Sequence, residues 1–155
     1  MNDDLKISAD GVELVKHFEG LYLTAYLDPV KVWTIGYGHT GMTHLDGTVK
    51  AGRVITHAEA EKLLKHDLTA FENRVKRFVK VDLHQHEFDA LVSFDFNTGA
   101  LGRSTLLKWM NKGKRLQAGA EFLKWTRGPG KVLPGLVRRR RAERAMFLGE
   151  IPDFK

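Results

Sequence analysis

The sequence predicts a mostly helical α+β fold with a small β-sheet near the N-terminus. Residues 22–39 are rich in aromatic and β-branched residues interrupted by turn formers, which favours short strands. From residue 56 onward, apolar residues recur at helical spacing between caps, glycines and prolines. The chain has 155 residues, 43% of them hydrophobic and 28% charged, which is typical of a globular protein that buries a core.

The N-terminal third is expected to hold one helix, the strands and a loop. Three apolar residues spaced three apart predict a helix over residues 8–18, with Ser8 as its cap. The strands and turns of residues 22–39 follow. Residues 41–53, which contain three glycines, are expected to form a loop.

A long helix is expected to begin at Thr56. Thr56 and Glu59 form a capping box, in which each side chain can bond a backbone N–H that the helix leaves unpaired. The apolar residues that follow alternate between spacings of four and three, namely Leu64, Leu68, Phe71, Val75 and Phe78. This stripe predicts a helix that faces a core and is long enough to connect two lobes.

Further helices are expected in the C-terminal half. A second capping box over residues 82–85 would begin a helix that ends near residues 97–99. Helices over residues 104–110 and 114–125 would follow, then a loop at residues 128–130. Pro134 suits the first turn of a last helix that ends near Leu148.

Two carboxylates and a hydroxyl occur among aromatic residues and glycines in the segment from His17 to Gly41. Glu19 lies at the end of the first expected helix, and Asp28 and Thr34 lie in the expected strand region. Hydrolysis of a glycosidic bond needs one group to protonate the leaving oxygen and another to hold or activate a water. The three residues alone are a weak signal, because most carboxylates on a protein surface are only solvated.

Their spacing is more specific. The pattern Glu19-x8-Asp28-x5-Thr34, continued by Ile-Gly-Tyr-Gly-His39, resembles the T-even-phage-type lysozymes and the lambdoid phage endolysins. Other motifs of that family follow in the same order. Residues 55–63 are similar to its interlobe helix, residues 93–99 to a loop beside its substrate cleft, and residues 133–143 to its C-terminal helix. The resemblance covers residues 8 to 149.

The resemblance implies a single lysozyme-like catalytic domain over residues 1–155 with two lobes. A small N-terminal β-sheet lobe would comprise about residues 18–55, and a long interlobe helix about residues 56–80. A helical C-terminal lobe would comprise about residues 81–150 together with residues 1–17.

The resemblance also implies a mechanism. The protein would be a muramidase that cleaves the β-1,4 bond between N-acetylmuramic acid and N-acetylglucosamine in peptidoglycan. Glu19 would act as the general acid, while ionised Asp28 stabilises the oxocarbenium-like transition state and Thr34 helps to hold the attacking water. The family is similar to inverting glycosidases, so the two carboxyl groups are expected roughly 6.5–9.5 Å apart.

Further site residues are carried over from the family pattern. The expected substrate contacts are Tyr37, Thr40, Phe94, Asn97 and Ser104. His39 and Asp67 correspond to a buried structural ion pair. Arg139 and Arg140 correspond to an arginine pair, one of which would pair with Glu19 or contact carboxylates of the glycan or peptide.

No cofactor or metal is implied. The remaining histidines show no metal-ligand spacing, and residues 84 and 86 would point apart on a helix. The run Arg138–Arg141 would point all around its helix, so it does not form a stripe for nucleic acid. Trp109 and Trp125 are better explained as core residues than as platforms for sugars.

The charge is uneven and suggests a polyanionic partner. Residues 1–48 carry three Lys/Arg against seven Asp/Glu, and the remainder carries 22 against 12, within a net charge of +6. Nucleic acid, an anionic membrane and an anionic cell wall would each fit this charge. Together with the resemblance, we expect a monomer that acts on bacterial peptidoglycan, with no nucleic-acid partner and no stable insertion into a membrane.

The expected localisation follows from what the sequence lacks. It has no cysteine, no apolar segment typical of a signal peptide and no membrane anchor of the kind that some endolysins carry. The protein is therefore expected in the host cytoplasm until a separate holin-type protein permeabilises the membrane and gives access to the cell wall.

One residue departs from the family pattern, and three alternative functions stay open. Lys31 occupies the turn after Asp28 where relatives usually carry glycine, which puts the geometry of that turn in doubt. A lytic transglycosylase, a non-catalytic glycan-binding module and a nucleic-acid binder are the alternatives. The last is disfavoured because the final helix lacks a base-reading motif.

Overall fold

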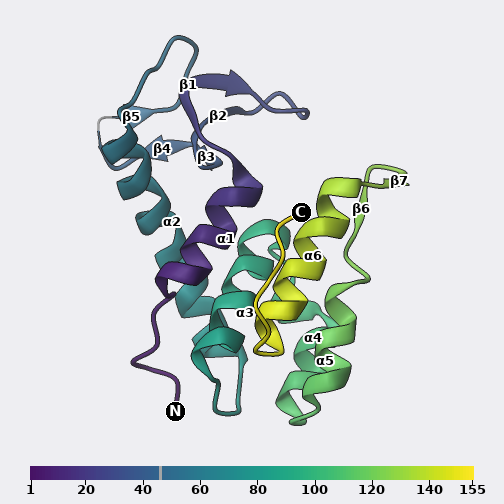
Figure 1. Ribbon diagram of the computed structural model, residues 1–155. Helices are drawn as coiled ribbons and strands as arrows, with labels where there is room; N and C mark the ends of the chain where they lie inside the picture. The colour runs from purple at the N-terminus through teal and green to yellow at the C-terminus, as the bar shows by residue number, and fades with distance from the viewer. Residues whose placement is uncertain (46) are drawn as a thin grey trace. The chain divides into compact units, whose positions relative to one another are not determined.

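The computed structural model describes residues 1–45 and 47–155 (Figure 1). Its helices are α1 (Ala9–Glu19), α2 (His57–Phe78), α3 (Gln85–Thr98), η1 (Leu101–Arg103), α4 (Thr105–Asn111), α5 (Arg115–Phe122) and α6 (Pro134–Phe147). Its strands are β1 (Tyr22–Leu27), β2 (Trp33–Gly36), β3 (His39–Thr40), β4 (Met42–Thr43), β5 (Gly47–Thr48), β6 (Arg127–Gly128) and β7 (Lys131–Val132). The predicted fold class, mostly helical α+β with a small N-terminal sheet, is confirmed.

The chain divides into two compact units. The smaller unit comprises Glu19–Ala70, and the larger unit comprises Met1–Phe18 together with Phe71–Lys155. Helix α2 begins in the smaller unit and ends in the larger one.

The smaller unit is built on a three-stranded antiparallel sheet in the order β1-β2-β3. Thr34 of the central strand lies opposite Tyr26 on one side and Thr40 on the other. Ile35, Ile55 and Leu63 are buried and form part of the core beneath this sheet. The segment expected to be a loop over residues 41–53 contains the short antiparallel pair β4–β5, too brief to leave an alternating pattern in the sequence.

The larger unit packs its helices around α3 (Figure 1). Residues 87–95 of α3 are buried without interruption, and α6 is its main packing partner. Buried aromatic side chains fill the core, among them Phe88, Phe94, Phe122 and Phe147. A short hairpin of β6 and β7 encloses the loop expected at residues 128–130.

The start of α3 differs from the prediction. The capping pair is His84 and Glu87, not Asp82 and Gln85, because the backbone N–H of His84 donates to Glu87 Oε1 at 2.8 Å. Asn2 explains the shift, since its Oδ1 accepts from the N–H of Leu83 at 2.9 Å and so fixes the approach to the helix.

Among the described residues, none of the helices combines the length and the apolar character that a membrane span needs.

Candidate active site

Glu19 is the last residue of α1, and its carboxylate lies against the backbone of Gly38. A Cβ atom on Gly38 would stand 2.8 Å from Glu19 Oε1, and Gly38 has φ +83°. The left-handed backbone favours glycine at this position, and any larger residue would also displace the Glu19 carboxylate. The Gly-Tyr-Gly part of the sequence motif therefore has a physical reason, because it brings a loop directly against the candidate acid.

Asp28 lies in the turn between β1 and β2, and the backbone holds its carboxylate. Oδ1 accepts from the N–H of Val30 at 2.9 Å and from the N–H of Val32 at 2.8 Å. Among the described residues, no group bonds Oδ2, so this oxygen is available to a ligand or a water. Lys31 has φ 64°, a left-handed backbone that favours glycine, yet the turn forms with lysine in place.

Thr34 lies in the middle of β2 and is buried, with 4% of its surface exposed. Its hydroxyl donates to the carbonyl of Val32 at 3.0 Å. Since the proton of the hydroxyl is used in this bond, the oxygen is left to accept a hydrogen bond from another donor, such as a water.

Tyr26 is a neighbour of the site that the sequence interpretation missed. The pKa of its phenol is raised, first by burial and then by the charges of Tyr22, Glu19 and Asp28. The phenol therefore stays neutral in the electrostatic field of both candidate catalytic carboxylates.

The structure brings His39 and Asp67 together. His39 Nδ1 lies 2.7 Å from Asp67 Oδ2, and the other ring nitrogen lies 3.2 Å from the carbonyl of Met42. The hydrogen bond to Asp67 is the main cause that raises the pKa of His39, against the opposing effect of burial. The contact joins the sheet to α2 within the smaller unit.

Tyr37 and Thr40, two of the expected substrate contacts, differ in exposure. Tyr37 is buried and its hydroxyl donates to Glu61 Oε1 at 3.3 Å, whereas Thr40 is exposed at the end of the sheet. Of these two residues, Thr40 is the one whose side chain can meet a ligand directly.

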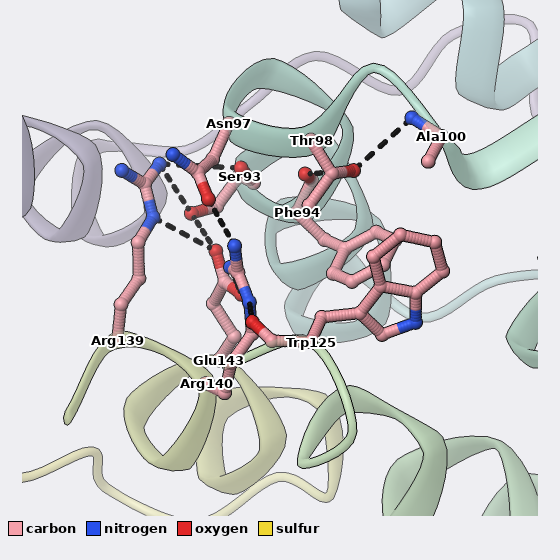
Figure 2. A network of polar contacts seen from close by, with 9 residues as sticks. All are labelled: Ser93, Phe94, Asn97, Thr98, Ala100, Trp125, Arg139, Arg140 and Glu143. Atoms are coloured by element: carbon pink, nitrogen blue, oxygen red, sulfur yellow. Dashed lines mark hydrogen bonds and ion pairs between the residues drawn. The ribbon is translucent and has the colours of Figure 1, made fainter. Parts of the chain in front are cut away.

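In the larger unit, Arg139 and Arg140 share the buried carboxylate of Glu143 (Figure 2). Arg139 Nε lies 3.1 Å from Oε2, and Arg140 Nη1 lies 2.5 Å from Oε1. Ser93 donates to Glu143 as well, at 2.5 Å. All of these groups are nearly without solvent exposure, so the arginines join α6 to α3 inside the unit.

The other expected substrate contacts of the larger unit surround this network. Asn97 is exposed and its Oδ1 accepts from Arg140 Nη2, as Figure 2 shows. Phe94 is fully buried against Trp125, with ring centroids 5.5 Å apart. Ser104 is buried and caps α4 by accepting from the N–H of Leu107 at 3.1 Å. Of the three, only Asn97 presents polar atoms at the surface.

Within the described part of the chain, no cluster of three or more histidine, aspartate or glutamate side chains could hold a metal ion.

Comparisons with known proteins relate this geometry to a family. The phage lysozyme family model matches residues 16–143. An endolysin of Bacillus phage B103 is 47% identical over 93% of this chain, and this chain covers 54% of that protein. An endolysin of Salmonella phage P22 is 43% identical, with 93% of this chain and 99% of the relative covered.

A solved structure agrees with the sequence matches. The endolysin from Escherichia coli O157:H7 phage FAHEc1 superimposes with a TM-score of 0.86 at 36% identity, covering 97% of this chain and 98% of that chain. The chain spans only a little over half the length of the Bacillus phage relatives. Because the family model spans the segment that contains Glu19, Asp28 and Thr34, the chain belongs to the phage lysozyme family.

Proposed function

We propose that this protein is a peptidoglycan hydrolase that cleaves the β-1,4 bond between N-acetylmuramic acid and N-acetylglucosamine. Family membership supports the reaction class, and the relatives named above are endolysins. The observation that carries the proposal is the arrangement of the smaller unit. There, Glu19 lies against Gly38, and the backbone orients Asp28 with one carboxylate oxygen available.

Glu19 protonates the leaving oxygen from its position at the end of α1, where its carboxyl group lies against the backbone of Gly38. Asp28 uses Oδ2 to orient water and stabilise the developing positive charge. Thr34 accepts a hydrogen bond from the same water, since its own proton is engaged with Val32. Attack by that water, whose proton passes to Asp28 Oδ2, inverts the anomeric carbon without a covalent intermediate.

The substrate contacts divide into two kinds. Thr40 and Asn97 are exposed and contact the glycan directly. Tyr37, Phe94 and Ser104 are buried and support the surfaces that the glycan meets. Two groups of residues are structural and take no part in the chemistry. They are the pair of His39 and Asp67 within the smaller unit, and Arg139 and Arg140 within the larger unit. A holin-type protein gives the enzyme access to the wall, where it acts as a monomer.

The deciding experiment compares wild type with Glu19→Gln on purified Gram-negative peptidoglycan and reads the released fragments by mass spectrometry. We expect reducing muropeptides from wild type and none from Glu19→Gln, whose circular dichroism stays that of wild type. Anhydro-sugar ends would instead identify a lytic transglycosylase. Binding without release by either protein would identify a glycan-binding module.

A further inference from the structure

The segment after α6 turns back and runs along the larger unit. Gly149 has φ +79°, and its N–H donates to the carbonyl of Met146 at 3.0 Å. The N–H of Glu150 donates to the carbonyl of Ala145 at 2.9 Å, so the chain reverses directly after the helix. Figure 1 shows the yellow segment that follows passing along α6 towards α1.

Phe154 joins this segment to the last turn of α1. Its ring centroid lies 4.9 Å from that of His17 and 5.8 Å from that of Phe18. The rings of His17 and Phe18 meet edge to face at 4.8 Å. These distances are typical of favourable aromatic pairs, so the three rings form one cluster.

Between its two ends the segment is loosely held. A cavity of about 490 Å³ lies beside it, lined by residues of α1, α3, α6 and the segment itself, among them Asp10, His86 and Met146. Ile151 is 96% exposed. The rings at Phe154 therefore attach the far end of an otherwise largely exposed segment to α1.

We propose that Phe154 is a positioning residue for Glu19. The last turn of a helix has unpaired carbonyls and frays readily. His17 and Phe18 directly precede Glu19 in the last turn of α1, and Gly20 with φ +74° ends the helix after it. The ring cluster therefore suppresses fraying at the residue whose carboxylate must fit against Gly38. This inference rests on the proposed role of Glu19 as the acid.

The test compares Phe154→Ala with two other variants. Phe154→Tyr keeps the ring, and Ile151→Ala changes an exposed residue of the same segment. Initial rates of reducing-end release from purified peptidoglycan give kcat and KM well below each melting temperature. Hydrogen exchange of the amides of residues 17–20 reports the order of the helix end.

For Phe154→Ala we expect kcat to fall about tenfold, because misplacing a catalytic group slows the chemical step. KM should stay within about twofold, since the residue does not touch the glycan. Exchange at residues 17–20 should accelerate, and Phe154→Tyr and Ile151→Ala should match wild type. Phe154→Leu replaces Phe154→Ala if the latter does not fold.

Two results would overturn the inference. One is an unchanged kcat in the folded Phe154→Ala protein, even if its melting temperature drops, since that would make the residue merely structural. The other is unchanged hydrogen exchange at the end of α1. If wild type itself releases no fragments, the proposed function fails instead, and the exchange experiment still decides whether Phe154 holds the helix end.

Discussion

At the scale of single residues, the sharpest predictions concern three residues with a left-handed backbone, namely Gly38, Gly41 and Lys31. Gly38→Ala places a methyl group 2.8 Å from Glu19 Oε1, whereas a Cβ on Gly41 meets nothing within 4 Å. Both glycines have similar φ, +83° and +78°. The two alanine variants therefore share the backbone strain, and only one of them disturbs the carboxylate.

We expect Gly38→Ala to lose activity by about 100-fold, because the displaced carboxylate no longer meets the leaving oxygen. Both variants should lower the free energy of unfolding by about 1–2 kcal/mol, because they share the backbone strain. The activity of Gly41→Ala should stay close to that of wild type. Peptidoglycan turnover and urea unfolding measure the two effects. Equal losses of activity in both variants would mean that strain, and not contact with Glu19, matters at Gly38.

Lys31 carries a strain that glycine would relieve. At φ 64° a side chain costs about 1–2 kcal/mol. Glycine would relieve this strain, but its larger unfolded-state entropy would offset part of the gain in stability. Lys31→Gly should thus raise the free energy of unfolding by about 0.5–1 kcal/mol in urea titration. Lys31→Ala removes the charge but keeps the strain, so it should not stabilise. A gain of the same size with alanine would assign the effect to charge.

At the scale of elements, the pair of His39 and Asp67 joins β3 to α2 and makes the stability depend on pH. The hydrogen bond to Asp67 raises the pKa of His39 above 6.5 in the folded protein. A group whose pKa is raised on folding contributes its full stabilisation at pH values below its unfolded-state pKa. That contribution is lost as the pH rises through its folded-state pKa.

Asp67→Ala should therefore lower the free energy of unfolding by about 1–3 kcal/mol at pH 5.5 and by less at pH 9. Urea unfolding across this range measures the difference, and muramidase activity well below the melting temperature should change little. Thr69→Ala, an exposed change on the same helix, serves as the control with no such pH dependence. A loss that is equal at both pH values would contradict the assignment.

The sequence predicts those elements whose signals are local. The capping box at Thr56 forms as expected, with hydrogen bonds of 2.9 and 3.1 Å between Thr56 and Glu59. The short pairs β4–β5 and β6–β7 could not be predicted, because their pairing is set by tertiary contacts. The displaced cap at His84 depends on Asn2, which lies more than 80 residues away in the chain.

The same division applies to the candidate site. The spacing of Glu19, Asp28 and Thr34 indicates the family, because motif order is encoded directly in the chain. The bonding of Arg139 and Arg140 to Glu143 and Asn97 could not be read from the run of four arginines. Of the four arginines, Arg139 and Arg140 are buried in the folded protein, while Arg138 and Arg141 stay exposed.

At the scale of the whole molecule, the positive charge is concentrated in one unit. The larger unit carries 20 Lys/Arg against 13 Asp/Glu, and the smaller unit carries 5 against 6. If the basic larger unit draws the enzyme to the anionic wall, charge reversal there should weaken wall binding more than the same reversal in the smaller unit.

Two double variants test this with matched net charge. Lys108→Glu with Lys114→Glu changes two exposed residues of the larger unit, and Lys50→Glu with Lys65→Glu changes two exposed residues of the smaller unit. At low salt the first should raise KM for peptidoglycan about threefold or more relative to the second, with kcat unchanged. At about 1 M salt, where the Debye length is about 3 Å, the difference should vanish. A KM difference that persists in high salt would show that these lysines contact the wall directly, and identical KM values at low salt would mean that only the total charge matters.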